Sequence, residues 1–126
     1  MSYEVSQRFY FEAAHTLDRE IDAAGSRRIH GHTYQCEVTV SGQPDPLTGM
    51  VVDLGLLRRH IQSVRDVLDH AMLDDVAGLG PATLENLCAF IARQMGAVRP
   101  AVAAVRVWRE ASGDSCLLRV DPTETM

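Results

Sequence analysis

Three histidines, His15, His30 and His32, offer the clearest chemistry in this chain and follow the spacing H-x14-H-x-H. Every second residue is apolar in the run that ends at His15 and in the run that begins at His30. All three histidines fall on these apolar positions. Because alternate residues of a strand point to one face, the imidazoles should leave a sheet on its apolar side.

Three imidazoles beside apolar surface are costly unless they are hydrogen-bonded or bound to something. Zinc takes three protein ligands at catalytic sites and keeps its fourth position for water or substrate. We therefore expect a Zn²⁺ site with an open position. The alternative interpretation is two ordinary core histidines and one loop histidine.

Asp69 and His70 form a second candidate pair, next to the end of a predicted helix. A carboxylate can orient an imidazole for acid–base chemistry near neutral pH. Adjacent helical residues do not face each other, so this pair needs a break in the helix. The alternative is a histidine that simply favours the helix dipole.

Glu110 and Ser26 are weaker candidates when taken alone. Glu110 shares strand parity with Trp108, and a carboxylate there could accept two N–H donors from a 2-amino-4-oxo-pyrimidine ring. It could equally be a solvated strand end. Ser26 precedes two arginines that could bind phosphate, but the segment also reads as a solvated loop.

Composition predicts one domain, residues 1–126, with a real core. The net charge of −5 argues against general nucleic-acid binding. No apolar run reaches membrane-spanning length, and the alternating N-terminus lacks a signal-peptide core, so we expect a cytoplasmic protein. The three cysteines form no C-x-x-C and are expected to be reduced core residues, and the lack of lysine excludes Schiff-base and Walker A chemistry.

The elements that must position these residues follow from periodicity. Alternation predicts strands over 3–14, 32–41, 102–110 and 116–120, and apolar spacing of three and four predicts helices over 54–68 and 84–95. Asp53 and Thr83 are the expected N-caps. The order ββααββ predicts a two-layer α+β domain with a mobile loop at 17–29. Nothing obviously blunts the sheet edges, so edge pairing could join subunits.

Five short segments, taken in order, resemble the 6-pyruvoyltetrahydropterin synthase / 6-carboxytetrahydropterin synthase family. They are FEAAH at 11–15, IHGHTY at 29–34, TGMVVD at 48–53, LDH at 68–70 and PATLEN at 81–86. The resemblance covers essentially the whole chain. It implies the tunnelling fold, a four-stranded antiparallel sheet with two helices on one face, whose subunits join into barrels, commonly homohexamers.

The resemblance also implies a site. Zn²⁺ would be held by His15, His30 and His32, the pterin by Glu110 with the Thr83 region, and protons would be moved by His70 oriented by Asp69. The implied reaction is that of the queuosine-pathway branch, in which 7,8-dihydroneopterin triphosphate gives 6-carboxytetrahydropterin, triphosphate and acetaldehyde. A sibling activity would give a 6-pyruvoyl- or 6-hydroxymethyl-pterin.

One position departs from the family. Its members carry a cysteine general base four residues before the His-Gly-His, and this chain has Ser26 there. A serine hydroxyl stays protonated without a strong base, whereas a thiol ionises readily. A third hypothesis is therefore a zinc-bearing, pterin-binding homologue of low activity.

Overall fold

The computed structural model describes residues 1–121. Its sheet has four antiparallel strands in the order β1-β2-β3-β4, which confirms the predicted α+β architecture. The strands are β1 (Tyr3–His15), β2 (His30–Gly42), β3 (Val102–Arg109) and β4 (Asp114–Arg119); the helices are α1 (Ala23–Arg27), α2 (Leu54–Leu68) and α3 (Leu84–Gln94), with a 3₁₀ turn, η1, at Leu73–Asp75.

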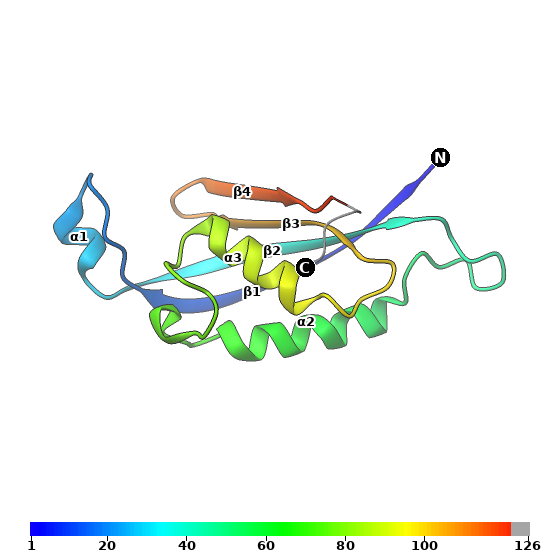
Figure 1. Cartoon of the computed structure of the whole chain (residues 1–126), viewed down its shortest axis with the longest axis horizontal. Helices are drawn as coiled ribbons and strands as arrows, with labels where there is room; N and C mark the ends of the chain where they lie inside the picture. The colour runs from blue at the N-terminus through cyan, green and yellow to red at the C-terminus, as the bar shows by residue number, and fades with distance from the viewer. Residues whose placement is uncertain (122–126) are drawn as a thin grey trace.

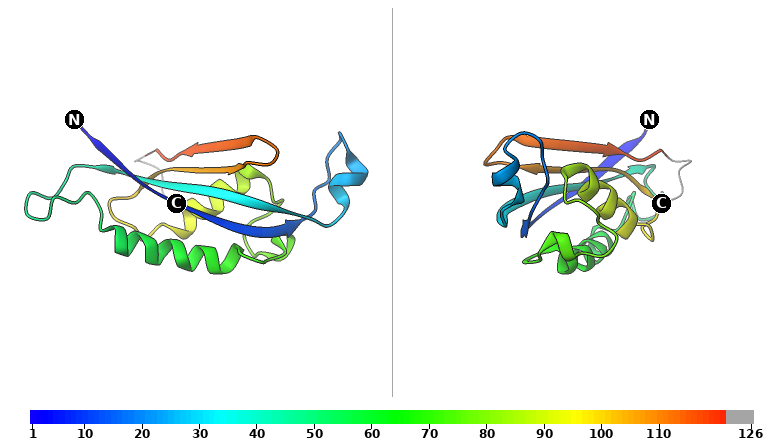
Figure 2. Two further views of the ribbon diagram at one scale, coloured as in Figure 1. Left: turned by 180° about the vertical axis from the view of Figure 1, so that it is seen from behind. Right: turned by 60° about the vertical axis from the view of Figure 1, so that its left-hand side comes forward.

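The helices α2 and α3 cover one face of the sheet, as Figures 1 and 2 show. Helix α2 packs on β1, and α3 packs on β3 and β4. The prediction missed α1, a five-residue helix inside the segment that we expected to be a loop. The helix lies at the far end of the β1–β2 pair, beyond His15 and His30 (Figure 1).

Both long helices begin where the sequence predicts. The Asp53 carboxylate accepts hydrogen bonds from the backbone N–H groups of Gly55 and Leu56, and the Thr83 hydroxyl accepts one from Asn86. Each cap satisfies N–H groups that have no partner within the helix. The first turn of each helix is therefore stabilised by its own capping side chain.

The core lies between the sheet and these two helices. Alternate strand residues point into it, and Phe11, Tyr34, Val38 and Val107 are fully buried. The opposite face of the sheet is polar and open within the single chain; Glu12 and its strand neighbours stand on it. Among residues 1–121, no helix is long and apolar enough to cross a membrane.

One edge of the sheet differs from expectation. The segment from Asp69 to Asp74 runs along the free edge of β1 and covers its C-terminal end. Ala14 N–H donates to the Ala71 carbonyl at 3.0 Å, and His70 N–H donates to the Glu12 carbonyl at 2.6 Å. This segment therefore blunts part of the edge that the sequence left without a visible cover.

Candidate functional site

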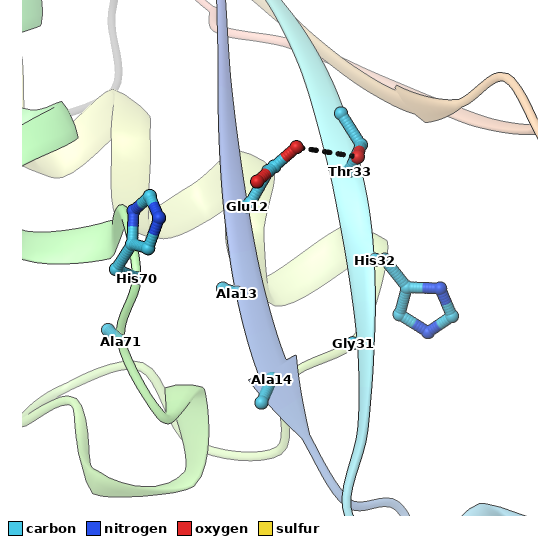
Figure 3. Close-up of a pocket in the computed structure, with 8 residues that line it drawn as sticks. All are labelled: Glu12, Ala13, Ala14, Gly31, His32, Thr33, His70 and Ala71. Atoms are coloured by element: carbon cyan, nitrogen blue, oxygen red, sulfur yellow. Dashed lines mark hydrogen bonds between the residues drawn. The ribbon is translucent and has the colours of Figure 1, made fainter.

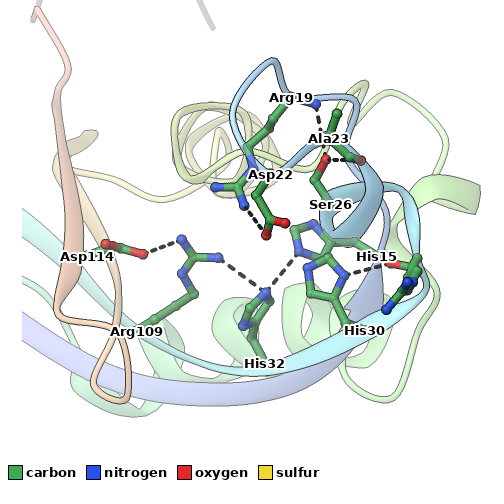
Figure 4. Close-up of polar contacts among 10 residues, drawn as sticks. His15, Arg19, Asp22, Ala23, Ser26, His30, His32, Arg109 and Asp114 are labelled. Atoms are coloured by element: carbon green, nitrogen blue, oxygen red, sulfur yellow. Dashed lines mark hydrogen bonds and ion pairs between the residues drawn. The ribbon is translucent and has the colours of Figure 1, made fainter.

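The strand register brings the three histidines to one place. His15, the last residue of β1, lies directly opposite His30, the first residue of β2, and His32 lies opposite Ala13. All three side chains leave the face that also carries the core, so the predicted parity holds. Figure 4 shows the three imidazoles converging below α1.

The imidazoles are close enough to share one ion. Nε2 of His15 and Nε2 of His32 are 3.0 Å apart. The ring centroids of His30 lie 4.5 Å from His15 and 5.0 Å from His32. One nitrogen from each ring falls within 4.8 Å of the other two. His15 is 1% exposed, while His30 and His32 are half-buried and leave the cluster open on one side.

Backbone carbonyls hold two of the rings in the orientation that a metal requires. Nδ1 of His15 lies 3.2 Å from the Ala82 carbonyl, and Nδ1 of His30 lies 2.7 Å from the Arg28 carbonyl. Because a carbonyl oxygen only accepts, each Nδ1 must carry the proton and each Nε2 must present a lone pair. This arrangement is the usual outer support of a metal-binding histidine.

Burial and nearby positive charge favour the neutral forms of His15 and His32. Burial, and then the charge of Arg109, lower the pKa of His32 to about 4. Burial, followed by the neighbouring His30, lowers the pKa of His15. Lone pairs on two imidazoles that face each other at 3.0 Å repel unless a cation lies against them. A trio of neutral imidazole nitrogens fits Zn²⁺.

Arg109 is a member of this site that the sequence reasoning missed. Its Nη1 lies 3.3 Å from Nε2 of His32, and its Nη2 donates to the Asp114 carboxylate (Figure 4). Its Nε is buried and has no hydrogen-bond partner among the described residues. A signal was available, because Arg109 shares strand parity with Val105 and Val107, which point into the core.

Asp69 and His70 form the predicted pair, because α2 ends at Leu68. His70 adopts a left-handed backbone conformation (φ 57°), and its Nδ1 lies 2.9 Å from the Asp69 carboxylate. The other Asp69 oxygen accepts from the Glu12 backbone N–H at 3.0 Å. This backbone hydrogen bond, followed by the one from His70, lowers the pKa of Asp69. A left-handed non-glycine residue is strained, as functional residues often are.

His70 lines a hollow of about 430 Å³ on the open side of the β1–β2 pair, and His32 is also among the residues that line it. Glu12 and Thr33, joined by a hydrogen bond, form its wall beside His70 (Figure 3). Figure 3 also shows the imidazole of His32 pointing away from His70. The pair and the histidine cluster therefore face different sides of the two strands within one chain.

Ser26 and Thr83 already have hydrogen-bonding roles in the fold. Ser26 is 1% exposed; its hydroxyl donates to the Ala23 carbonyl at 2.9 Å and accepts from the Arg19 N–H at 3.2 Å. The Thr83 hydroxyl caps α3. The residue before Thr83, Ala82, supplies the carbonyl that holds His15, so the start of α3 does adjoin the cluster.

Glu110 lies just beyond β3, and its carboxylate accepts from the indole N–H of Trp108 at 2.8 Å. It nevertheless lines a hollow of about 370 Å³ together with His32 and Arg109. Of the two neighbouring side chains, Arg109 is the one that contacts the histidine cluster directly. Glu110 stands at the rim of the same opening.

The chain is similar to known proteins over most of its length. Residues 4–120 match the family described as 6-pyruvoyl tetrahydropterin synthase. A 6-carboxy-5,6,7,8-tetrahydropterin synthase of Synechocystis is 36% identical over 92 residues (69% of this chain, 70% of the relative). Human 6-pyruvoyl tetrahydrobiopterin synthase is 34% identical over 111 residues (77% of each chain).

Among solved structures, a Caenorhabditis elegans 6-pyruvoyl tetrahydropterin synthase superposes with a TM-score of 0.81 at 23% identity, over 96% of this chain and 97% of the other. This likeness supports the fold that the strand order and the two covering helices define.

Proposed function

Because the chain belongs to the 6-pyruvoyl tetrahydropterin synthase family, we propose that it is a zinc-dependent pterin lyase that converts 7,8-dihydroneopterin triphosphate to 6-carboxytetrahydropterin, triphosphate and acetaldehyde. The observation that carries the proposal is the cluster of His15, His30 and His32, with an accessible side and two carbonyl-held rings. Three histidine ligands leave a coordination position for substrate, which is typical of catalytic rather than structural zinc.

Bound zinc would act as a Lewis acid on the side-chain oxygens of the pterin and acidify the adjacent carbons. The chain supplies the rest. His15 and His30 are pre-oriented by the Ala82 and Arg28 carbonyls, so little ordering is needed when the metal binds. The buried position of His15 excludes water from one side of the cluster.

Asp69 and His70 would move the protons. With Nδ1 of His70 held by Asp69, Nε2 is the atom free to take or give a proton. Since His70 and the histidine cluster face different sides of β1 and β2, we propose that the complete site forms between subunits of a homohexamer, where the pair of one chain approaches the cluster of another. Glu110 and the Thr83 region would hold the pterin ring.

Ser26 favours a second candidate, a zinc-bearing pterin-binding protein with little turnover. Its hydroxyl is buried and makes two local hydrogen bonds, one of them to a carbonyl that fixes its proton. Among residues 1–121, its hydroxyl therefore has no hydrogen bond to a base that would make it act as the family's cysteine does. A sibling activity with a 6-pyruvoyl or 6-hydroxymethyl product is the third candidate, because named relatives of both synthase types match the chain.

One assay separates the three candidates. Zinc-loaded protein is incubated with 7,8-dihydroneopterin triphosphate, and triphosphate, acetaldehyde and pterin products are followed over time. Acetaldehyde with a carboxypterin supports the lyase, and triphosphate release without acetaldehyde supports the sibling activity. Tight pterin binding without any product supports the binding protein. Native mass spectrometry of the same sample tests for six subunits.

A further inference from the structure

The imidazole of His70 depends on Asp69 for its orientation. Its side chain is 77% exposed, so packing does not confine the ring. Among residues 1–121, the polar side-chain contact that orients it is the one between Nδ1 and the Asp69 carboxylate, at 2.9 Å. The backbone here is no longer helical, because Asp69 is extended (φ −72°, ψ 131°) and His70 is left-handed (φ 57°). What fixes the Asp69 carboxylate therefore also fixes the imidazole.

Two donors hold that carboxylate, one on each oxygen. The backbone N–H of Glu12 donates to Oδ1 at 3.0 Å. Nη2 of Arg65 lies 3.4 Å from Oδ2, which is also the oxygen that faces Nδ1 of His70. An anchor on Oδ1 alone leaves the carboxylate free to rotate about that hydrogen bond, whereas a second anchor on Oδ2 fixes its plane. Arg65 is thus placed to aim Oδ2 at the imidazole.

Arg65 is itself fixed to the sheet. Its Nε donates to the backbone carbonyl of Tyr10 at 2.7 Å, and its Cζ lies 5.2 Å from the centroid of the Tyr10 ring. A hydrogen bond and a cation–π contact to one residue leave the guanidinium little freedom. Two residues further along β1, the Glu12 carbonyl accepts from the His70 N–H. Arg65 therefore extends the cover of the β1 edge and ties the pair to the strand that ends at His15.

We propose that Arg65 is a positioning residue for the Asp69–His70 pair. Anchored on Tyr10, it holds the Asp69 carboxylate so that Nδ1 of His70 keeps its proton and Nε2 stays free for proton transfer. This inference rests on the proposed function and deepens it, because it explains how an exposed histidine acts at a defined place. Arg65 is not among the described residues that line the hollow beside His70, so it acts through Asp69.

The tautomer of His70 tests the proposal without any catalysis. The full chain is labelled with a nitrogen isotope, and long-range proton–nitrogen NMR spectra are recorded at about pH 9, where an ordinary histidine is neutral. His70→Gln assigns the His70 signals by their absence. We expect the unmodified chain to carry the His70 proton on Nδ1 alone, and Arg65→Met to show both tautomers, because a rotating carboxylate no longer selects one. Methionine keeps a good helix former at this position.

Arg58→Met is the matched control, because Arg58 also joins α2 to β1. Its Nε donates to the Gln7 side chain at 3.1 Å, and it lies nearer the start of α2. It should show a single tautomer of His70 and normal turnover. Arg65→Lys keeps the cation but cannot hold Tyr10 and Asp69 at once, so it should fall between the unmodified chain and Arg65→Met.

Turnover gives the second measurement. With 7,8-dihydroneopterin triphosphate, Arg65→Met should lower kcat about tenfold at an unchanged KM, because a proton-transfer group is misplaced while substrate contacts remain. A single Nδ1 tautomer in Arg65→Met, or equal changes in Arg65→Met and Arg58→Met, overturns the inference. If the unmodified chain forms no product, the proposed function is contradicted, and the tautomer comparison still decides the role of Arg65. If Arg65→Met does not fold, Arg65→Lys replaces it, and a His70 spectrum identical to that of the unmodified chain then overturns the inference.

Discussion

Nε2 of His15 lies 3.0 Å from Nε2 of His32, with the carbonyl of Ala82 on the far nitrogen of the first ring and the guanidinium of Arg109 against the second. The Ala82 carbonyl accepts from Nδ1 of His15 and so leaves a lone pair on its Nε2, and the Arg109 guanidinium requires a lone pair on Nε2 of His32. Two lone pairs pointed at each other are unfavourable in the empty cluster and favourable around a cation. This relationship links the fold to metal binding.

Metal binding should therefore stabilise the fold. A ligand that binds only the native chain at about a thousand times its Kd raises the free energy of unfolding by about 4 kcal/mol. We expect zinc to raise the melting temperature in calorimetry, and EDTA to reverse the effect. His32→Ala should abolish the zinc-dependent shift, whereas His60→Ala, a half-buried residue of α2 that lies outside the cluster, should keep it. A shift of equal size in both variants would place the metal elsewhere.

Asp69 should have separable roles in structure and in proton transfer. Asp69→Asn keeps an oxygen that can accept from the Glu12 N–H, but it loses the charge that faces His70. We expect near-normal stability with turnover reduced about 100-fold, whereas Asp69→Ala should lose stability as well. Normal turnover in Asp69→Asn, measured with the triphosphate assay, would remove Asp69 from the mechanism.

The pH dependence of stability gives an independent measurement on Asp69. The Glu12 N–H and His70 lower the native pKa of Asp69 below the ordinary value of 3.8. The contribution of Asp69 to the free energy of unfolding is therefore fully present above that pH. The contribution is lost as the pH falls through the lowered pKa, because the protonated carboxyl keeps less of these interactions. The stability difference between the native chain and Asp69→Ala should be constant from about pH 8 to 5 and shrink below about pH 4. A difference that persists unchanged at pH 2 would contradict this cause.

Ser26→Cys tests whether the hydroxyl limits turnover. A thiol can ionise near neutral pH, and a positioned general base contributes about 10²-fold or more. We expect turnover to rise by about that factor, with a pH profile that gains a basic limb. Ser26→Ala is the control; it removes the bonds to Ala23 and Arg19 without supplying a base. If Ser26→Cys and the native chain turn over equally, the missing thiol is not the limiting feature.

Local sequence patterns predict much of the fold and of the histidine cluster. Apolar parity predicted that His15, His30 and His32 share a face, and cap chemistry predicted where α2 and α3 begin, because both depend on residues close together in sequence. The contact of Arg109 with His32 joins residues 77 positions apart, and the cover over the β1 edge joins Glu12 to His70. Both depend on how strands and segments distant in sequence pair, which periodicity alone does not encode.

The proposed binding of the pterin ring by Glu110 can be measured through its neighbour Trp108. Its carboxylate accepts from the indole N–H of Trp108, the single tryptophan, so ring binding at Glu110 should change that residue's fluorescence. We expect Glu110→Gln to raise the pterin Kd about tenfold or more, since a charged acceptor becomes neutral, while metal content stays the same. An unchanged pterin Kd, measured by fluorescence titration, would assign the ring to other residues.

The most direct measurement is the zinc content of the purified chain by elemental analysis, with and without His30. We predict one zinc per chain in the native protein, and loss of stoichiometric zinc in His30→Ala with the fold retained by circular dichroism. A native chain that holds no zinc after incubation with the metal, or a His30→Ala variant that binds it as tightly, would contradict the assignment of His15, His30 and His32 as its ligands.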